Sequence, residues 1–160
     1  MKATALALVA IVACIGAGPA SYTLHINQPH APVVQFAEQT ALVGDLNASR
    51  AAAGLRPLIV DDRLMRAAMV HARDMAAKQY FAHEGPDGST LANRLHDVAF
   101  DWTIAAENIA LNSDEQHAHT ALLHSPEHRE NILDPRLRYV GVAALSIGAS
   151  STLYVEDFAR

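Results

Sequence analysis

The chain has 160 residues, of which 51% are hydrophobic, and its net charge is −5. This length and composition predict a single domain with an apolar core. The sequence contains no basic stripe and no dense interleaving of aromatic with basic residues, so nucleic acid is not an expected partner.

The first 20 residues are typical of a secretory signal segment. Lys2 precedes a short apolar run that is not long enough to anchor the chain across a bilayer. Two processing sites stay open: cleavage before Ser21, or cleavage at a bacterial lipobox that makes Cys14 the lipidated first residue. Cys14 is the only cysteine, so no disulfide is expected. Membrane contact is expected only through this segment or through a lipid on Cys14.

Residues 21–32 are polar and contain two prolines, which predicts a linker ahead of a domain spanning 33–160. From Val33 apolar residues recur at helical spacing as far as the alanines at 51–53. Gly54 then supplies the residue that often ends a helix in the left-handed conformation. Asp61 and Asp62 open a second helix. His71 shares its apolar face with core positions, which favours a structural role for this histidine.

The second half of the domain mixes short helices with strands. Pro86-Asp87-Gly88 predicts a turn, and Thr90 can cap a short helix after it. Residues 102–111 are compatible with a strand. Residues 139–145 and 152–158 predict a terminal hairpin that turns near residue 148. Helices followed by antiparallel strands indicate an α+β fold.

The stretch "HSPEHRENIL" at 124–133 formally matches an inverted zinc-protease motif through His124, Glu127 and His128. That motif requires a continuous helix, and Pro126 interrupts it because proline fits only the first helical position. We therefore expect Ser125 to cap a new helix that carries His128 in its first turn. The positive end of the helix dipole there favours the neutral imidazole, the form that binds metals or accepts protons.

Glu107, within "AAENIAL", is a carboxylate among apolar neighbours. A buried carboxylate needs partners, whereas one at a strand edge can point into water. The local sequence leaves both interpretations open. His128 has a similar alternative, since a histidine near a helix start can simply pack.

Six segments in register resemble one family. They are "LNASRAAAGLRPL" at 46–58, "HARDM" at 71–75, "YFAHEGPDGST" at 80–90, "AENIA" at 106–110, "SPEHRENIL" at 125–133 and "VGVA" at 140–143. Together they resemble the bacterial branch of the CAP superfamily, the SCP-like extracellular proteins related to cysteine-rich secretory and plant pathogenesis-related proteins. The resemblance covers residues 34–158. It implies a three-layer α-β-α sandwich with an antiparallel sheet and a secreted or cell-envelope location.

The resemblance also implies a site. The family gathers two histidines and two acidic residues in a central cleft, where several members bind a divalent metal. His83, Glu107 and His128 match three of these groups, while Ser125 stands where the second acid would be. The resemblance thus implies a weak site for Zn²⁺ or another divalent metal on His83, Glu107 and His128. His71 matches as a supporting core residue.

Two functions follow from this site. The first, which we favour, is a secreted or lipid-anchored binding module whose cleft holds a metal, a small apolar ligand or a protein partner without chemistry. The second is a metal-assisted hydrolase, such as a peptidase, with His83 and His128 on the ion and Glu107 as the base. The missing second acid favours the first. Ser125 is a weak nucleophile candidate beside His128, and helix capping explains it better.

Overall fold

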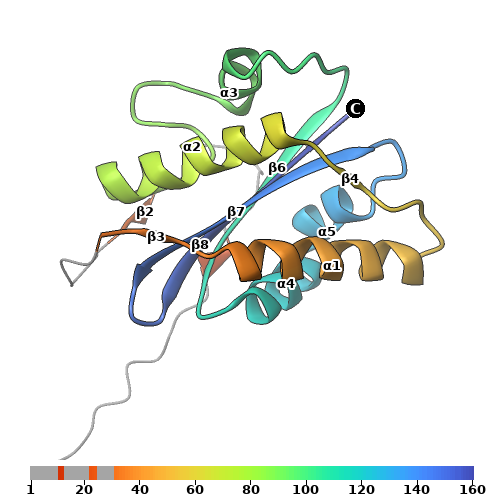
Figure 1. The fold of residues 1–160 in the computed structure, drawn as a ribbon, viewed down its shortest axis with the longest axis horizontal. Coiled ribbons are helices and arrows are strands. Elements are labelled where there is room, and N and C mark those ends of the chain that lie inside the picture. The colour runs from red at the N-terminus through yellow and green to blue at the C-terminus, as the bar shows by residue number, and fades with distance from the viewer. Residues whose placement is uncertain (1–10, 13–21, 25–30) are drawn as a thin grey trace, which may run out of the picture.

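A computed structural model describes residues 11–12, 22–24 and 31–160. It places helices on both faces of a mainly antiparallel sheet (Figure 1). The helices are α1 (Phe36–Ala52), α2 (Asp62–Lys78), α3 (Leu91–Asp97), α4 (Glu115–His124) and α5 (Pro126–Ile132). The strands are β1 (Ile11–Val12), β2 (Tyr22–Thr23), β3 (Val33–Val34), β4 (Ile59–Val60), β5 (Tyr80–Phe81), β6 (Ala105–Asn112), β7 (Tyr139–Gly148) and β8 (Ser151–Ala159).

Three long strands form the centre of the sheet, in the order β6-β8-β7. The predicted terminal hairpin is confirmed, because β7 and β8 pair antiparallel along nearly their whole length. β8 also pairs antiparallel with β6, and this register sets Glu107 opposite Asp157 and Asn108 opposite Glu156. The short strands β3 and β4 both pair with β7. β3 runs antiparallel to β7, and β4 runs parallel to it.

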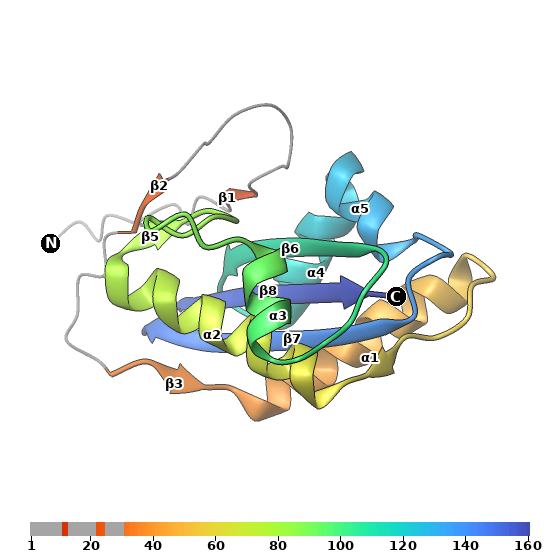
Figure 2. The ribbon, with the colours of Figure 1, turned by 90° about the horizontal axis from the view of Figure 1, so that it is seen from above.

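Helices cover the sheet from two sides. α2 and α3 lie over one face, while α1, α4 and α5 lie over the other (Figures 1 and 2). Because both faces are covered, both sides of the central strands carry apolar residues. Ile109, Ala143 and Val155 pack under α2, whereas Val142, Tyr154 and Phe158 pack toward α1 and α4. The predicted three-layer α-β-α sandwich is confirmed.

The helix ends follow the predicted chemistry. Gly54 has φ +73° just beyond α1, as expected of a glycine that ends a helix. The Asp61 side chain accepts a hydrogen bond from the Arg63 backbone N–H at the start of α2. Thr90 and Asn93 form a reciprocal capping box at the start of α3. Helix α4, which begins directly after Asp114, was not predicted from the sequence.

Gly141 allows α2 to lie very close to β7. A Cβ atom at this position would be 2.0 Å from the Leu64 carbonyl carbon and 2.2 Å from the Met65 backbone nitrogen. Only a residue without a side chain fits that gap. Small buried residues of α2, including Ala67 and Ala68, support the same close approach.

The N-terminal segments touch the domain at two points. β1 pairs with β6, and β2 pairs with β5. The first lies within the predicted signal segment and the second within the predicted linker. Cys14 lies outside the described residues, so its predicted lipidation stays a prediction. Over the ranges that the structure describes, no helix combines the length and apolar character required to traverse a bilayer.

Candidate functional site

Glu107 is the centre of a buried polar cluster under α2 and α3. Glu107 is only 2% exposed, so its carboxylate does not point into water. His83 Nδ1 lies 2.8 Å from Glu107 Oε1, and Arg94 Nη2 lies 2.5 Å from Glu107 Oε2. Both carboxylate oxygens are therefore engaged by partners from the loop before α3 and from α3 itself.

His71 completes the cluster from α2. Its Nε2 lies 3.0 Å from the Ala82 carbonyl oxygen and 3.8 Å from Glu107 Oε1. Burial lowers the pKa of His71 to about 4, in spite of the Glu107 charge, so this imidazole is neutral at physiological pH. The neutral ring donates its Nε2 proton to the carbonyl. This geometry agrees with the supporting core role predicted for His71.

The charge of the cluster resides on Glu107. Burial raises the pKa of its carboxyl, but the hydrogen bond from His83 and the nearby positive charges, Arg94 among them, outweigh burial and leave the pKa below its ordinary value. Asp157 lies opposite on β8 and behaves differently. Burial and the neighbouring Glu107 charge raise its pKa well above the ordinary value. In this coupled pair, ionisation of Glu107 therefore favours the protonated form of Asp157.

His83 is held in one orientation. The Arg94 guanidinium donates to its carbonyl oxygen at 3.3 and 3.4 Å, while the ionised Glu107 accepts from its Nδ1 proton. This tautomer leaves Nε2 as the lone-pair acceptor. His83 Nε2 is buried and has no hydrogen-bond partner among the described residues. A buried acceptor without a donor is costly, which makes this nitrogen the candidate ligand-binding atom.

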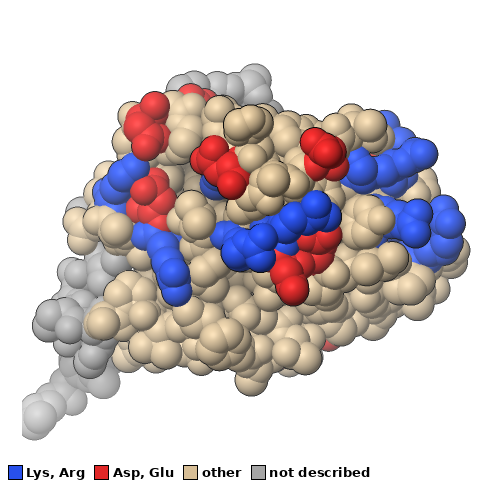
Figure 3. All heavy atoms as spheres, turned by 45° about the horizontal axis from the view of Figure 1, so that its top comes forward, with Lys and Arg blue, Asp and Glu red and all other residues tan. Residues whose placement is uncertain are grey.

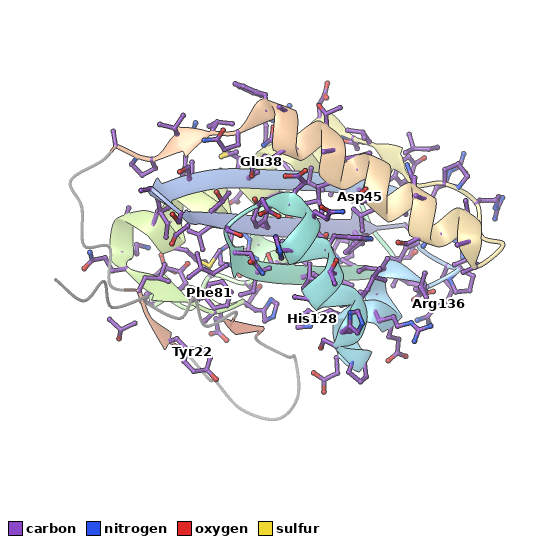
Figure 4. The ribbon with its side chains drawn as sticks, turned by 90° about the horizontal axis from the view of Figure 1, so that it is seen from below. Tyr22, Glu38, Asp45, Phe81, His128 and Arg136 are labelled. Carbon is purple, nitrogen blue, oxygen red and sulfur yellow. The ribbon has the colours of Figure 1, made fainter. Side chains whose placement is uncertain are left out.

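His128 enters from α5 on the other side of β6 (Figure 4). It is 1% exposed, and its Nδ1 lies 2.8 Å from Ser125 Oγ. Ser125 is the N-cap residue of α5, as predicted, but its hydroxyl makes no side-chain capping bond and faces the imidazole instead. The predicted helix break is confirmed, since α4 ends at His124 and α5 begins at Pro126.

A second buried network fixes the start of α5 against the sheet. Asn108 Nδ2 donates to the His128 carbonyl oxygen at 3.2 Å and to Glu156 Oε2 at 2.9 Å. Asn131 Nδ2 donates to Asn108 Oδ1 at 2.9 Å. Successive residues of a strand point to opposite faces, so Glu107 and Asn108 serve opposite sides of β6. His83 and the start of α5 therefore flank this strand.

The predicted metal ligands differ in how well the structure places them to coordinate a metal ion. Within the described parts of the chain, no group of three or more His, Cys, Asp and Glu side chains is arranged to hold a metal. Glu107 has both oxygens occupied by His83 and Arg94, so it orients the imidazole and is not positioned as a ligand. His83 Nε2, buried and without a hydrogen-bond partner among the described residues, has the character of a metal-donor atom. Metal binding stays a prediction.

Sequence reasoning did not identify five members of these networks: Arg94, Asn108, Asn131, Glu156 and Asp157. Arg94 lies in a short helix whose sequence is typical of a surface helix, and nothing local indicates that it is 5% exposed. The pairing of β6 with β8 would have indicated Asp157 and Glu156, because it sets them opposite Glu107 and Asn108.

Comparisons with known proteins agree with the geometry. The model of the cysteine-rich secretory protein family (CAP) matches residues 43–158. The uncharacterized protein YkwD of Bacillus subtilis strain 168 is 31% identical over 120 residues, which are 74% of this chain and 47% of that protein. The chain thus spans about half the length of this relative.

Two solved structures share the fold. An extracellular protein with an SCP domain from Bacillus anthracis strain Ames superposes with a TM-score of 0.70 at 30% identity, covering 78% of this chain and 40% of the other. An outer surface protein of Borrelia burgdorferi superposes with a TM-score of 0.76 at 20% identity, covering 81% of this chain and 97% of the other. At this identity the similarity is one of fold alone. With the family match over most of its length, this chain belongs to the cysteine-rich secretory protein (CAP) family.

Proposed function

We propose that this protein is a secreted or envelope-located CAP domain that binds a ligand at His83 without catalysing a reaction. The location is supported by the Bacillus anthracis relative, which is described as an extracellular protein, and by the signal-like N-terminus. The binding role is supported by one observation above all: Glu107 orients the imidazole of His83 through Nδ1, and the buried Nε2 of that ring has no hydrogen-bond partner among the described residues.

The same geometry opposes a hydrolase that uses Glu107 as its base. A general base must reach the proton of a water or substrate, directly or through one water. Glu107 is buried, its two oxygens are held by His83 and Arg94, and its pKa is lowered. A carboxylate with a lowered pKa is also a weak proton acceptor at neutral pH.

The proposal includes weak divalent-metal binding through the imidazoles of His83 and His128, with Glu107 orienting His83. A bound zinc ion would supply a Lewis acid with an open position. Calorimetric titration with zinc tests this part. We expect weak binding that is lost in His83→Ala and His128→Ala and retained in His96→Ala, a matched control whose side chain is 86% exposed. Equal heats in all four proteins would contradict the metal site.

Turnover of a peptide library separates the binding module from the hydrolase. We expect none from the native protein with or without added zinc. Turnover that disappears in Glu107→Gln would establish the metal-assisted hydrolase instead. Turnover that disappears in Ser125→Ala while Glu107→Gln stays active would indicate a serine nucleophile, for which the contact of Ser125 Oγ with His128 Nδ1 at 2.8 Å is the favourable observation.

Lipid anchoring through Cys14 is a separate part of the proposal. Mass analysis of the mature protein from a bacterial host distinguishes the two processing sites. A lipid adduct on an N-terminal Cys14 supports the anchored form. A chain that begins at Ser21 supports free secretion and excludes the anchor.

A further inference from the structure

Five arginines line one cavity at the end of the sheet where β4 and β7 begin. The cavity has a volume of about 400 Å³. The arginines come from three separate segments, and no Asp or Glu lines the cavity: they are Arg50, Arg56, Arg136, Arg138 and Arg160. This volume is within the range of small-molecule sites. Figure 3 shows basic side chains gathered at this end of the molecule.

This concentration of charge contrasts with the rest of the chain. The sequence contains 12 Lys and Arg residues against 17 Asp and Glu residues. With five arginines at the cavity, only seven basic residues remain to balance the 17 acidic ones elsewhere. Like charges that lie close together repel one another. An anion in the cavity would be attracted to every guanidinium group that no carboxylate already neutralises.

The backbone fixes the segments that carry these arginines. The Ile59 N–H donates to the Arg138 carbonyl oxygen at 2.9 Å, which joins the segment of Arg56 to the start of β7. The Arg138 N–H donates to the Ala159 carbonyl oxygen at 3.0 Å, which joins β7 to the residue before Arg160. The positions of the three segments are therefore set before any ligand arrives, and such preorganisation lowers the cost of binding.

Arg50 stabilises the floor of the cavity and is not itself a free binding group. It is 1% exposed, and its guanidinium donates to four backbone carbonyl oxygens. The acceptors belong to Arg56, Ile132, Asp134 and Leu137, at 3.0, 2.8, 3.0 and 3.3 Å. These bonds hold two segments against the end of α1: the one that follows α1, through Arg56, and the one that leads from α5 to β7.

The exposed guanidinium groups differ in what already neutralises them. Arg136 forms an ion pair with Asp134 at 2.7 Å. In the described part of the chain, no carboxylate pairs with Arg56, Arg138 or Arg160; the Arg138 guanidinium lies only over the Tyr139 ring, 5.5 Å from its centre. Three guanidinium groups thus remain available to an anion.

We propose that this cavity binds a phosphate-bearing anion. Guanidinium groups match phosphate oxygens with paired N–H donors, which a single lysine cannot do. Three available guanidinium groups on fixed backbone suit a group with several anionic oxygens, such as a diphosphate or a phospholipid headgroup. This site is distinct from His83 and lies on segments that the proposed binding function does not use.

Calorimetric titration with inorganic pyrophosphate at low salt tests the site. We expect one binding event per chain that weakens as sodium chloride is added. Arg56→Gln and Arg138→Gln should each weaken binding about tenfold or more, because each removes charge-assisted hydrogen bonds. Both side chains are exposed, so the fold should survive the changes. Arg73→Gln is the matched control: it removes the same charge from an exposed position on α2.

Sedimentation with vesicles distinguishes the source of the phosphate. Binding to phosphatidylglycerol vesicles but not to phosphatidylcholine vesicles, lost in Arg56→Gln and Arg138→Gln, identifies a lipid headgroup. Pyrophosphate binding without vesicle binding identifies a soluble phosphate. Either result supports the cavity. Binding to neither probe overturns the proposal, and so does an equal loss in Arg73→Gln, which would indicate attraction by net charge alone.

Discussion

Replacing Glu156 by glutamine is expected to stabilise the protein increasingly as pH rises from 4 to 8, relative to the native chain. Glu156 is fully buried, and its only hydrogen bond among the described residues comes from Asn108 Nδ2. Burial, opposed only by that bond, raises the pKa of its carboxyl from 4.5 to about 7. The native fold therefore retains a proton on Glu156 that the unfolded chain releases at lower pH.

The sign of the effect follows from this difference. Below pH 4.5 both states are protonated, so the group adds no pH dependence. Between pH 4.5 and 7 the unfolded state ionises first, which stabilises it and lowers the free energy of unfolding. The difference between the pKa of Glu156 in the unfolded chain, 4.5, and in the fold, about 7, corresponds to about 3 kcal/mol of unfolding free energy. The native protein has lost all of this stability once the pH is well above 7. Glutamine cannot ionise, and any cost of its unpaired amide is the same at every pH.

Urea unfolding of the native protein and of Glu156→Gln, at pH 4 and at pH 8, measures this quantity. The stability difference between the two proteins should move by about 3 kcal/mol in favour of the variant. Glu84→Gln serves as the control, because Glu84 is exposed and loses the same charge. The reasoning is refuted when the Glu156→Gln difference is the same at both pH values.

Two further predictions concern the α2 face. Gly141→Ala should destabilise the fold by about 3 kcal/mol or more, because its Cβ would meet the Leu64 backbone at 2.0 Å; Gly44→Ala, where nothing lies within 4 Å, should not. Thermal unfolding of both variants tests this, and a stable Gly141→Ala would contradict the packing. Arg94→Gln should cost about 3–5 kcal/mol, because it leaves the Glu107 charge without its closest cation. The double variant with Glu107→Gln should recover part of that loss, and urea unfolding that finds none would disprove the pairing.

Much of the fold was predictable because local chemistry determines it. Gly54 ends α1, and Asp61 begins α2, through contacts within a few residues of the chain. Pro126 separates α4 from α5 for the same kind of reason, since its ring cannot occupy the interior of a helix. Alternating apolar residues near the C-terminus were sufficient to predict the β7–β8 hairpin.

The remaining features depend on contacts between distant residues. α4 was missed because its sequence, "EQHAHTALLH", has only a weak apolar face, and its packing against α1 stabilises it in the fold. The contact of the Ser125 hydroxyl was not predicted, for a related reason. Its position before Pro126 fits a cap, but the hydroxyl faces His128 Nδ1. A local sequence pattern identifies the position of a residue in a helix. It does not identify which of two nearby partners the side chain contacts.

The chemistry of the site also depends on Arg94, which no motif indicated. With Arg94 absent, burial would still raise the pKa of Glu107 and the hydrogen bond from His83 would still lower it, but one of the charges that lower it would be lost, so the pKa would rise. With Arg94 at 2.5 Å, Glu107 instead stays ionised and holds His83 in one tautomer. The carboxylate then defines which imidazole nitrogen can accept a partner. In the function proposed above, ligand recognition at this site begins at His83 Nε2, and Glu107 contributes through the orientation it imposes on that ring.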